Sequence, residues 1–289
     1  MSQLITVDAA TSSSSSASLT SSTKPLSAAS ATNNNSYITI AIEGNIGSGK
    51  TTFLQHIQQF NDRQTTVGHN NNNNVETFAE PIGQWRDIRG MNLFQLLHKD
   101  LNRWSFTFQS YVQLSMLAIH QTRPSRPEVT IKLMERSLYS ARYCFVENLY
   151  RRQCMRREEY AINDKWFEYM VKNCERVGID LIIYLRTDPE VAYERIRKRN
   201  RDEETGLTID YLRDLHDLHE QWLLGCSHGV IGAGGDGGGQ LFNDHISDKF
   251  AAPPLPAPVI TIDANQQLDV MKNLYDIHSA NIINGTVLR

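Results

Sequence analysis

The sequence predicts an α/β fold in which a five-stranded parallel sheet is doubly wound, with helices on both of its faces. Two observations support this fold. Short β-rich runs alternate along the chain with segments of helical periodicity, and a glycine-rich loop joins the first run to the first helical segment. The runs that we expect to form the strands are Tyr37–Glu43, Val75–Phe78, Thr130–Met134, Asp180–Leu185 and Val259–Ile262.

The composition of the 289-residue chain is typical of a globular intracellular protein. Its hydrophobic content of 40% is enough for a sizeable core, and its net charge of −3 provides no general surface for polymeric nucleic acid. The four cysteines have neither CxxC nor disulfide-scaffold spacing, so we expect reduced thiols. We find no apolar run near the roughly 18 residues of a membrane span, and we expect no signal peptide and no membrane association.

Three low-complexity segments lie outside the expected fold. Residues 1–36 are rich in Ser, Thr, Ala and Asn, and we expect them to be a disordered tail ahead of one domain at 37–289. Asn70–Asn74 reads as an expanded surface loop, and the Gly- and Pro-rich stretch at about 225–258 as a flexible insertion. Because the tail lacks the arginines of a mitochondrial transit peptide, we expect the cytoplasm, with the mitochondrion as the alternative.

The glycine-rich loop from Gly44 to Thr51 matches the phosphate-binding pattern GxxxxGK[ST] and lies between a strand and a helix, as that pattern requires. Its glycines let backbone N–H groups curve around an anion, while Lys50 can reach the β- and γ-phosphates and the Thr51 hydroxyl can bind Mg²⁺. We therefore expect ATP and Mg²⁺ here. The loop residues expected to bind ATP are Gly44, Asn45, Ile46, Gly47, Ser48, Gly49, Lys50, Thr51 and Thr52.

A phosphate loop alone does not separate small-molecule kinases from GTPases or ATPase motors. Asp87–Gly90 offers the DxxG pattern of a GTPase, but it does not directly follow a predicted strand, and no NKxD motif occurs downstream. A second motif must therefore decide between these classes.

Charged residues follow the second and third predicted strands, where each strand ends. Glu80 precedes Pro81, which fixes the local backbone, and Glu135 and Arg136 end the third strand at the same edge. An isolated Glu-Pro pair could also be a surface turn. The convergence favours Glu80 as a general base that Arg136 keeps ionised, with Arg136 neutralising phosphoryl charge and Glu135 holding Mg²⁺ together with Thr51.

These motifs together resemble the deoxynucleoside kinases, especially the broad-specificity insect members and the mitochondrial thymidine kinases. The resemblance runs from about Tyr37 to Leu224 and rests on EGNIGSGKTT, EPIGQWR, FQSYV, ERSLYSARYCFVEN, DLIIYLRTDPEVAYERIRKRNRDEE and YLRDLHDLHEQWL. It implies a P-loop kinase fold. It also implies ATP-dependent phosphorylation of the 5′-hydroxyl of thymidine, deoxycytidine and purine deoxynucleosides in nucleotide salvage.

The resemblance also implies a substrate pocket. Its residues are Glu80, Trp85, Leu97, His98, Phe108, Gln109, Val112, Met116, Arg136, Ala141, Phe145 and Glu204. The Gln109 amide could pair with thymine in one orientation and with cytosine in the other. Aromatic residues at such spacing are more often core than ligand contacts, and only the surrounding motifs favour a base pocket. Val112, Met116 and Ala141 are uncharged, as in the broad-specificity members, whereas the deoxycytidine-selective members carry a charged pair there.

One position departs from this family pattern. At His98 the insect and mitochondrial enzymes carry a tyrosine that shares the sugar 3′-hydroxyl with a glutamate, here Glu204. Neutral imidazole is shorter than phenol but can still donate or accept one hydrogen bond, and its protonated form can only donate. We therefore expect weaker discrimination against 3′-deoxy analogues.

A basic run follows the fourth predicted strand and leads toward Glu204. A solvated helix face, or a weak nucleic-acid patch, would also explain it. In a P-loop fold its position suits a lid that closes over the ATP phosphates, and the resemblance implies the same. The arginines expected to bind ATP are Arg195, Arg197, Arg199 and Arg201.

The sequence thus predicts a kinase in which Glu80, Arg136 and Lys50 are catalytic. A nucleoside-monophosphate kinase on the same scaffold would need extra cations for a 5′-phosphate, and a catalytically silent nucleotide-binding protein would not need these residues intact. A homodimer is implied by the resemblance alone, through helices around Phe108–His120 and Leu138–Tyr150.

Overall fold

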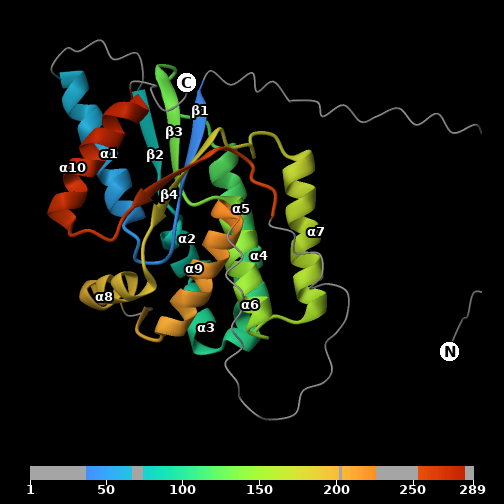
Figure 1. The fold of residues 1–289 in the computed structure, drawn as a ribbon. Helices are drawn as coiled ribbons and strands as arrows, with labels where there is room; N and C mark the ends of the chain where they lie inside the picture. The colour runs from blue at the N-terminus through green and yellow to red at the C-terminus, as the bar shows by residue number, and fades with distance from the viewer. Residues whose placement is uncertain (1–36, 67–73, 202–203, 226–252, 284–289) are drawn as a thin grey trace, which may run out of the picture. The chain divides into compact units, whose positions relative to one another are not determined.

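The computed structural model describes residues 37–66, 74–201, 204–225 and 253–283 (Figure 1). The predicted tail at 1–36, nearly all of the Asn-rich segment and most of the Gly- and Pro-rich insertion lie outside these residues.

All five predicted strands are present, each within one residue of its expected bounds. They form one parallel sheet in the order β2-β3-β1-β4-β5. The strands are β1 (Ile38–Glu43), β2 (Asn74–Phe78), β3 (Val129–Glu135), β4 (Leu181–Arg186) and β5 (Val259–Asp263). The predicted doubly wound α/β fold is therefore confirmed.

Helices cover both faces of the sheet, because successive strand residues point to opposite sides. Ile40 and Ile42 of β1 pack into a core with α1 and α10, while Ala41 between them faces a second, larger core with α4 and α9. Figure 1 shows this division, with α1 and α10 on one side of the sheet and α4, α7 and α9 on the other. The helices are α1 (Lys50–Thr66), α2 (Ile82–Arg86), α3 (Leu93–Lys99), α4 (Leu101–Gln121), α5 (Leu138–Ser140), α6 (Glu147–Arg151), α7 (Arg157–Asn173), α8 (Pro189–Arg199), α9 (Ile209–Leu224) and α10 (Leu268–Ile283), with a π-helix, η1, at Ala141–Val146.

The segment Leu138–Tyr150 differs from the single helix expected there. It consists of α5, η1 and the first residues of α6, and it is almost entirely buried within the chain. The prediction of one long helix is therefore wrong. The segment leaves little surface for contact with a second copy.

The long helix α4 is fixed at both ends by side chains. The Asp100 carboxylate accepts a hydrogen bond from the Arg103 backbone N–H and caps the first turn. At the other end the buried Lys132 ammonium of β3 donates to the last carbonyls of α4, at 2.6 Å from Ile119 and 2.8 Å from His120. A cation suits the negative end of the helix dipole, so Lys132 ties α4 firmly to the sheet.

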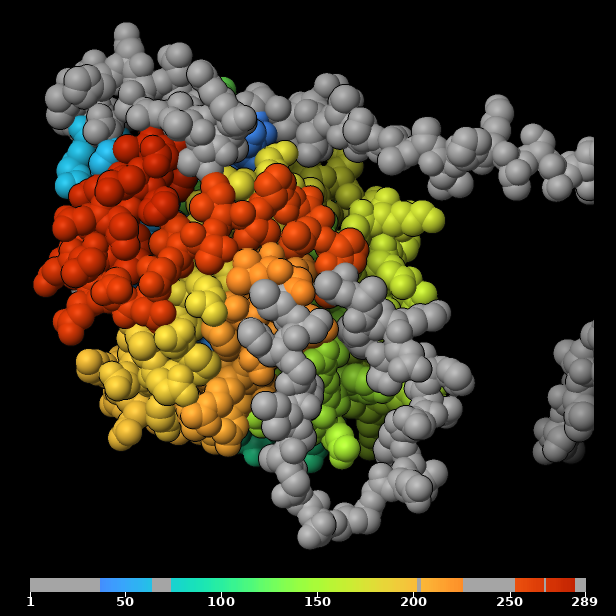
Figure 2. Space-filling model, viewed as in Figure 1, coloured from blue at the N-terminus to red at the C-terminus, as the bar shows by residue number. Residues whose placement is uncertain are grey.

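The C-terminal part of the described chain, from Pro253 onward, crosses the face of the molecule that Figure 2 turns to the viewer. Within the described residues, no helix is long and apolar enough to cross a membrane.

Candidate functional site

The phosphate loop lies between the end of β1 and the start of α1. Gly47 has a φ of +80°, and a Cβ there would lie 2.6 Å from the Ala192 carbonyl oxygen of α8, so the close approach of the two backbones requires glycine. The Lys50 ammonium is buried and turned onto its own loop, donating to the carbonyls of Asn45 at 2.7 Å and Gly44 at 3.1 Å. Burial lowers the pKa of Lys50 to about 7, and the nearby Arg136 acts in the same direction. A bound phosphate would favour its charged form.

Thr51 and Glu135 are brought together as predicted. The Thr51 hydroxyl donates to Glu135 Oε1 at 2.8 Å, across the edge where β3 ends beside the phosphate loop. A hydroxyl and a carboxylate are the hard oxygen donors that Mg²⁺ prefers. The two side chains therefore fit a magnesium ion that is otherwise bound by waters or phosphate oxygens, although among the described residues no three or more His, Cys, Asp or Glu side chains are grouped so that they could hold a metal ion.

Arg136 links the phosphate loop to Glu80. Its Nη1 donates to the Gly44 carbonyl at 2.9 Å, and its Nε lies 3.1 Å from Glu80 Oε1. The guanidinium also lies over the Phe145 ring, 4.6 Å from the centroid. The backbone of Arg136 has a φ of +62°, a left-handed conformation that is uncommon outside glycine. Side-chain contacts on three sides hold this residue in place.

The ionisation of Glu80 differs from the sequence-based expectation. Burial raises the pKa of Glu80 above its usual value, and the Arg136 guanidinium opposes that shift without cancelling it. Arg136 thus favours the ionised form as expected, but burial outweighs it. A carboxylate with a raised pKa is a stronger proton acceptor, which suits a general base.

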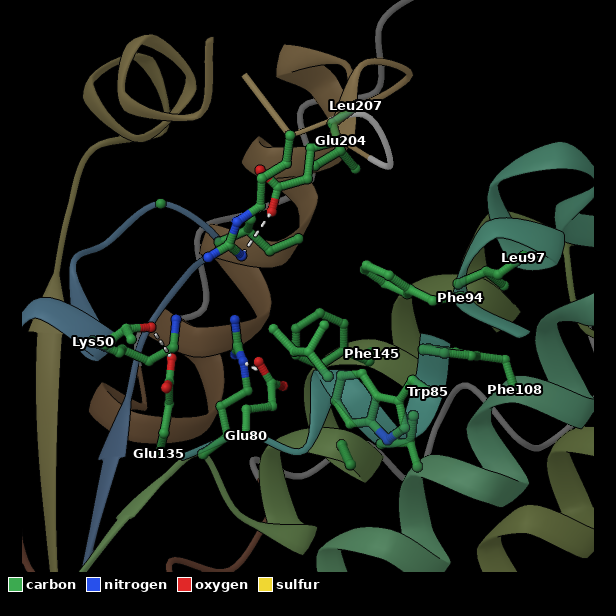
Figure 3. Close-up of a pocket in the computed structure, with 18 of the residues that line it drawn as sticks. Lys50, Glu80, Trp85, Phe94, Leu97, Phe108, Glu135, Phe145, Glu204 and Leu207 are labelled. Atoms are coloured by element: carbon green, nitrogen blue, oxygen red, sulfur yellow. Dashed lines mark hydrogen bonds and ion pairs between the residues drawn. The ribbon is translucent and has the colours of Figure 1, made fainter. Parts of the chain in front are cut away.

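One pocket joins these charged groups to an apolar chamber (Figure 3). It is lined by every residue predicted for the substrate, and by Lys50, Thr51 and Glu135 at its phosphate end. Gln109 is buried in the chamber, and its Oε1 finds no hydrogen-bond partner among the described residues. Because an unpaired buried amide oxygen is costly, a hydrogen bond from a bound ligand to this oxygen would be stabilising.

Aromatic side chains form the walls of the chamber. Trp85 donates from Nε1 to Ser115 Oγ at 2.9 Å and meets Phe108 edge to face at 5.5 Å between centroids. Phe94, which the sequence analysis did not include, stacks on Phe108 at 5.6 Å. Phe94 lies four residues, about one helical turn, before His98, and this spacing was the one sequence signal that could have placed it in the pocket. Other pocket residues that were missed are Ile82, Ser137, Leu207 and Tyr211.

His98 lines the pocket with a defined hydrogen-bonding state. Its Nδ1 lies 2.8 Å from the Phe94 carbonyl oxygen, and its ring meets the Phe94 ring at 88°. Because a carbonyl can only accept, we assign the proton of the neutral ring to Nδ1. His98 Nε2 is then a hydrogen-bond acceptor.

The basic run lies on α8 and just beyond it, and only part of it reaches the pocket. Arg199 forms a bidentate ion pair with Glu204, from Nη2 to Oε1 at 2.5 Å and from Nε to Oε2 at 3.1 Å. Arg201 Nη1 lies 3.6 Å from Oε1 of the same carboxylate. Arg195 instead donates to the Gln266 carbonyl at 2.7 Å, and Arg197 lies over the Tyr193 ring. The last two are not among the residues that line the pocket.

A family model described as deoxynucleoside kinase matches residues 40–281. The chain belongs to the deoxynucleoside kinase family. Among its relatives, human mitochondrial thymidine kinase 2 is 39% identical over 245 residues, which cover 84% of this chain and 77% of the relative. Mouse deoxycytidine kinase is 36% identical over 205 residues, covering 64% of this chain and 75% of the relative. Membership of this family confirms the predicted P-loop kinase, its use of ATP as phosphoryl donor and its phosphorylation of deoxynucleosides.

Proposed function

We propose that this enzyme transfers the γ-phosphoryl group of ATP to the 5′-hydroxyl of thymidine and deoxycytidine, and also of purine deoxynucleosides. One observation carries the proposal: the Glu80–Arg136 pair stands between a phosphate loop and an aromatic chamber that contains the unpaired amide oxygen of Gln109. The two named relatives, a thymidine kinase and a deoxycytidine kinase, are consistent with both pyrimidines.

In the proposed reaction Glu80 accepts the proton of the 5′-hydroxyl as the oxygen attacks the γ-phosphorus in line. Arg136 holds Glu80 in place and, with Lys50 and the lid arginines Arg199 and Arg201, stabilises the charge that develops on the phosphoryl oxygens. Mg²⁺, held by Thr51 and Glu135, would neutralise phosphate charge. The remaining predicted lid residues, Arg195 and Arg197, would need to turn toward the phosphates to contribute.

The base is proposed to lie between the aromatic walls, with Gln109 pairing to its edge. A primary amide offers an acceptor beside a donor, so one orientation suits the N–H and carbonyl of thymine and the other the ring nitrogen and amine of cytosine. Val112, Met116 and Ala141 present no charge to the base. This absence of charge supports a broad range of bases.

A radiolabelled transfer assay tests the proposal with thymidine, deoxycytidine, deoxyadenosine and thymidylate as acceptors. We expect transfer to the nucleosides and little to thymidylate, because the Glu80 carboxylate at the proposed 5′-hydroxyl position would repel a 5′-phosphate and already pairs with Arg136. Preferential transfer to thymidylate would indicate a monophosphate kinase, and no transfer at all would indicate a silent nucleotide-binding protein. Lys50→Met, expected to be inactive, controls for contaminating kinases.

We also propose that the enzyme is a homodimer, which its family resemblance implies. Support comes from an exposed apolar stripe on α7, where Ile162, Trp166 and Tyr169 follow one another at helical spacing, and from exposed Leu114 on the neighbouring α4. Light scattering on Trp166→Glu should show a monomer. The matched control Ile277→Glu, equally exposed on α10, should leave the mass unchanged.

The enzyme is proposed to act inside the cell, where ATP is available. The cytoplasm and the mitochondrion are the two compartments to distinguish, since the thymidine kinase relatives are named mitochondrial. Fractionation of cells that express the full chain would decide between them.

A further inference from the structure

The pocket wall contains a π-helix, a rare element. In η1 (Ala141–Val146) the turns are one residue wider than in the α-helices that flank it, since hydrogen bonds join residues five apart. Two of its residues, Ala141 and Phe145, line the pocket. The register of this turn therefore decides which side chains face the substrate.

A buried ionic network surrounds the π-helix. The Arg142 guanidinium, 5% exposed, donates from Nε to Asp164 Oδ1 at 2.7 Å and from Nη2 to the Tyr160 hydroxyl at 2.6 Å. Tyr160 donates in turn to Glu147 Oε2 at 2.8 Å, and Arg142 Nη1 lies 3.5 Å from the same oxygen. The network thus joins both ends of the π-turn to α7.

The spacing of the network fits the π register. Arg142 and Glu147 are five residues apart, and in an α-helix such residues lie about 140° apart around the axis, too far for both to reach one phenol. In a π-helix the same two residues share a face. Their common partner Tyr160, fixed on α7, therefore favours the wide turn over the α-helical one.

We propose that Arg142 is a positioning residue: with Glu147, Tyr160 and Asp164 it holds residues 141–146 in the π register and so places Ala141 and Phe145 in the nucleoside pocket. Phe145 in turn lies against Arg136, so the same register supports the arginine that holds Glu80. The inference rests on the proposed function of this pocket. A merely structural network would contribute stability without affecting how the nucleoside binds.

The test uses two mild variants of the full chain, because removing Arg142 itself would break its contacts with Asp164, Tyr160 and Glu147 all at once. Tyr160→Phe deletes the bridging hydroxyl, and Asp164→Asn removes the partner charge. We expect KM for thymidine to rise about five- to tenfold, the factor expected when one hydrogen bond of ordinary net strength is lost, while KM for ATP changes less than twofold. Asp164→Glu should restore much of the loss.

The matched control is Met155→Ala, which opens a cavity in the apolar cluster that also contains Tyr160 and Val146 but breaks no polar contact. It should lower the melting temperature and leave KM for thymidine unchanged. If Tyr160→Phe and Asp164→Asn also lower the melting temperature without changing KM for thymidine, the positioning role is refuted.

Amide hydrogen exchange of residues 141–146 separates this inference from the proposed function. We expect faster exchange there in Tyr160→Phe than in the natural protein, and no such change in Met155→Ala. If the natural protein proves inactive but exchange at residues 141–146 is still faster in Tyr160→Phe, the proposed function is refuted and the register argument stands. Exchange in Tyr160→Phe that is no faster than in the natural protein would refute the register argument itself.

Discussion

Replacing His98 by tyrosine tests how the proposed sugar site holds the 3′-hydroxyl. The Nδ1 proton of His98 is engaged by the Phe94 carbonyl, so Nε2 can only accept, and the Glu204 carboxylate on the same pocket can only accept as well. A 3′-hydroxyl has one proton, which satisfies one of these two acceptors. A tyrosine hydroxyl could donate to the 3′-oxygen while the 3′-hydroxyl donates to Glu204.

The magnitude follows from this count of donors and acceptors. His98→Tyr should add one hydrogen bond, worth about 1 kcal/mol, or about fivefold in kcat/KM. The gain applies only to substrates that carry the 3′-hydroxyl. The ratio of kcat/KM for thymidine to that for 3′-deoxythymidine should therefore be about fivefold higher in the variant than in the natural protein.

Steady-state kinetics with both nucleosides at saturating ATP measures this ratio. His98→Phe is the matched control, since it has the ring of tyrosine without the hydroxyl, and its ratio should not exceed that of the natural protein. An unchanged ratio in His98→Tyr would show that the histidine already does this work or lies outside the sugar site.

Three further predictions concern catalysis, pH and the N-terminal segment. Glu80→Gln keeps the shape of the side chain but removes the base, so kcat should fall by roughly 10²- to 10⁴-fold while thymidine still binds, and a near-normal kcat would rule out Glu80 as the base. Burial raises the pKa of Glu43 from 4.5 to about 7, despite a hydrogen bond from Ser137. The protonated form therefore favours folding, and this contribution is lost as the pH rises through 7. Glu43→Gln, which cannot ionise, should gain up to about 3 kcal/mol in unfolding free energy relative to the natural protein between pH 4 and pH 8, and urea titrations showing no such change would contradict this. Deleting residues 1–35, whose composition predicts little buried apolar area, should leave turnover and melting temperature nearly unchanged, and a loss of several degrees would refute that expectation.

The strands and the phosphate loop were predictable because their signals are local. A buried parallel strand reads as a continuous apolar run, and the GxxxxGK[ST] pattern fixes its own flanking elements. That Glu80 and Arg136 lie on one edge also followed, since parallel strands end together. The sequence could not show that Phe94 completes the aromatic wall, because its contact with Phe108 depends on how α3 packs against α4. Nor could it show the π register of 141–146, which depends on Tyr160 from a separate helix.

The two ends of the site are joined through one carbonyl group. Lys50 Nζ and Arg136 Nη1 both donate to the Gly44 oxygen, and Arg136 also holds Glu80. If a bound phosphate draws Lys50 away from this oxygen, Arg136 is the side-chain donor that remains on it. The arginine therefore stays in place when phosphate occupies the loop. The left-handed backbone of Arg136 costs on the order of 1 kcal/mol, and glycine would relieve it. Glycine would also remove the contacts to the loop and to Glu80. An arginine can hold this strained conformation because those contacts, which connect the phosphate loop to the proposed base, offset the cost.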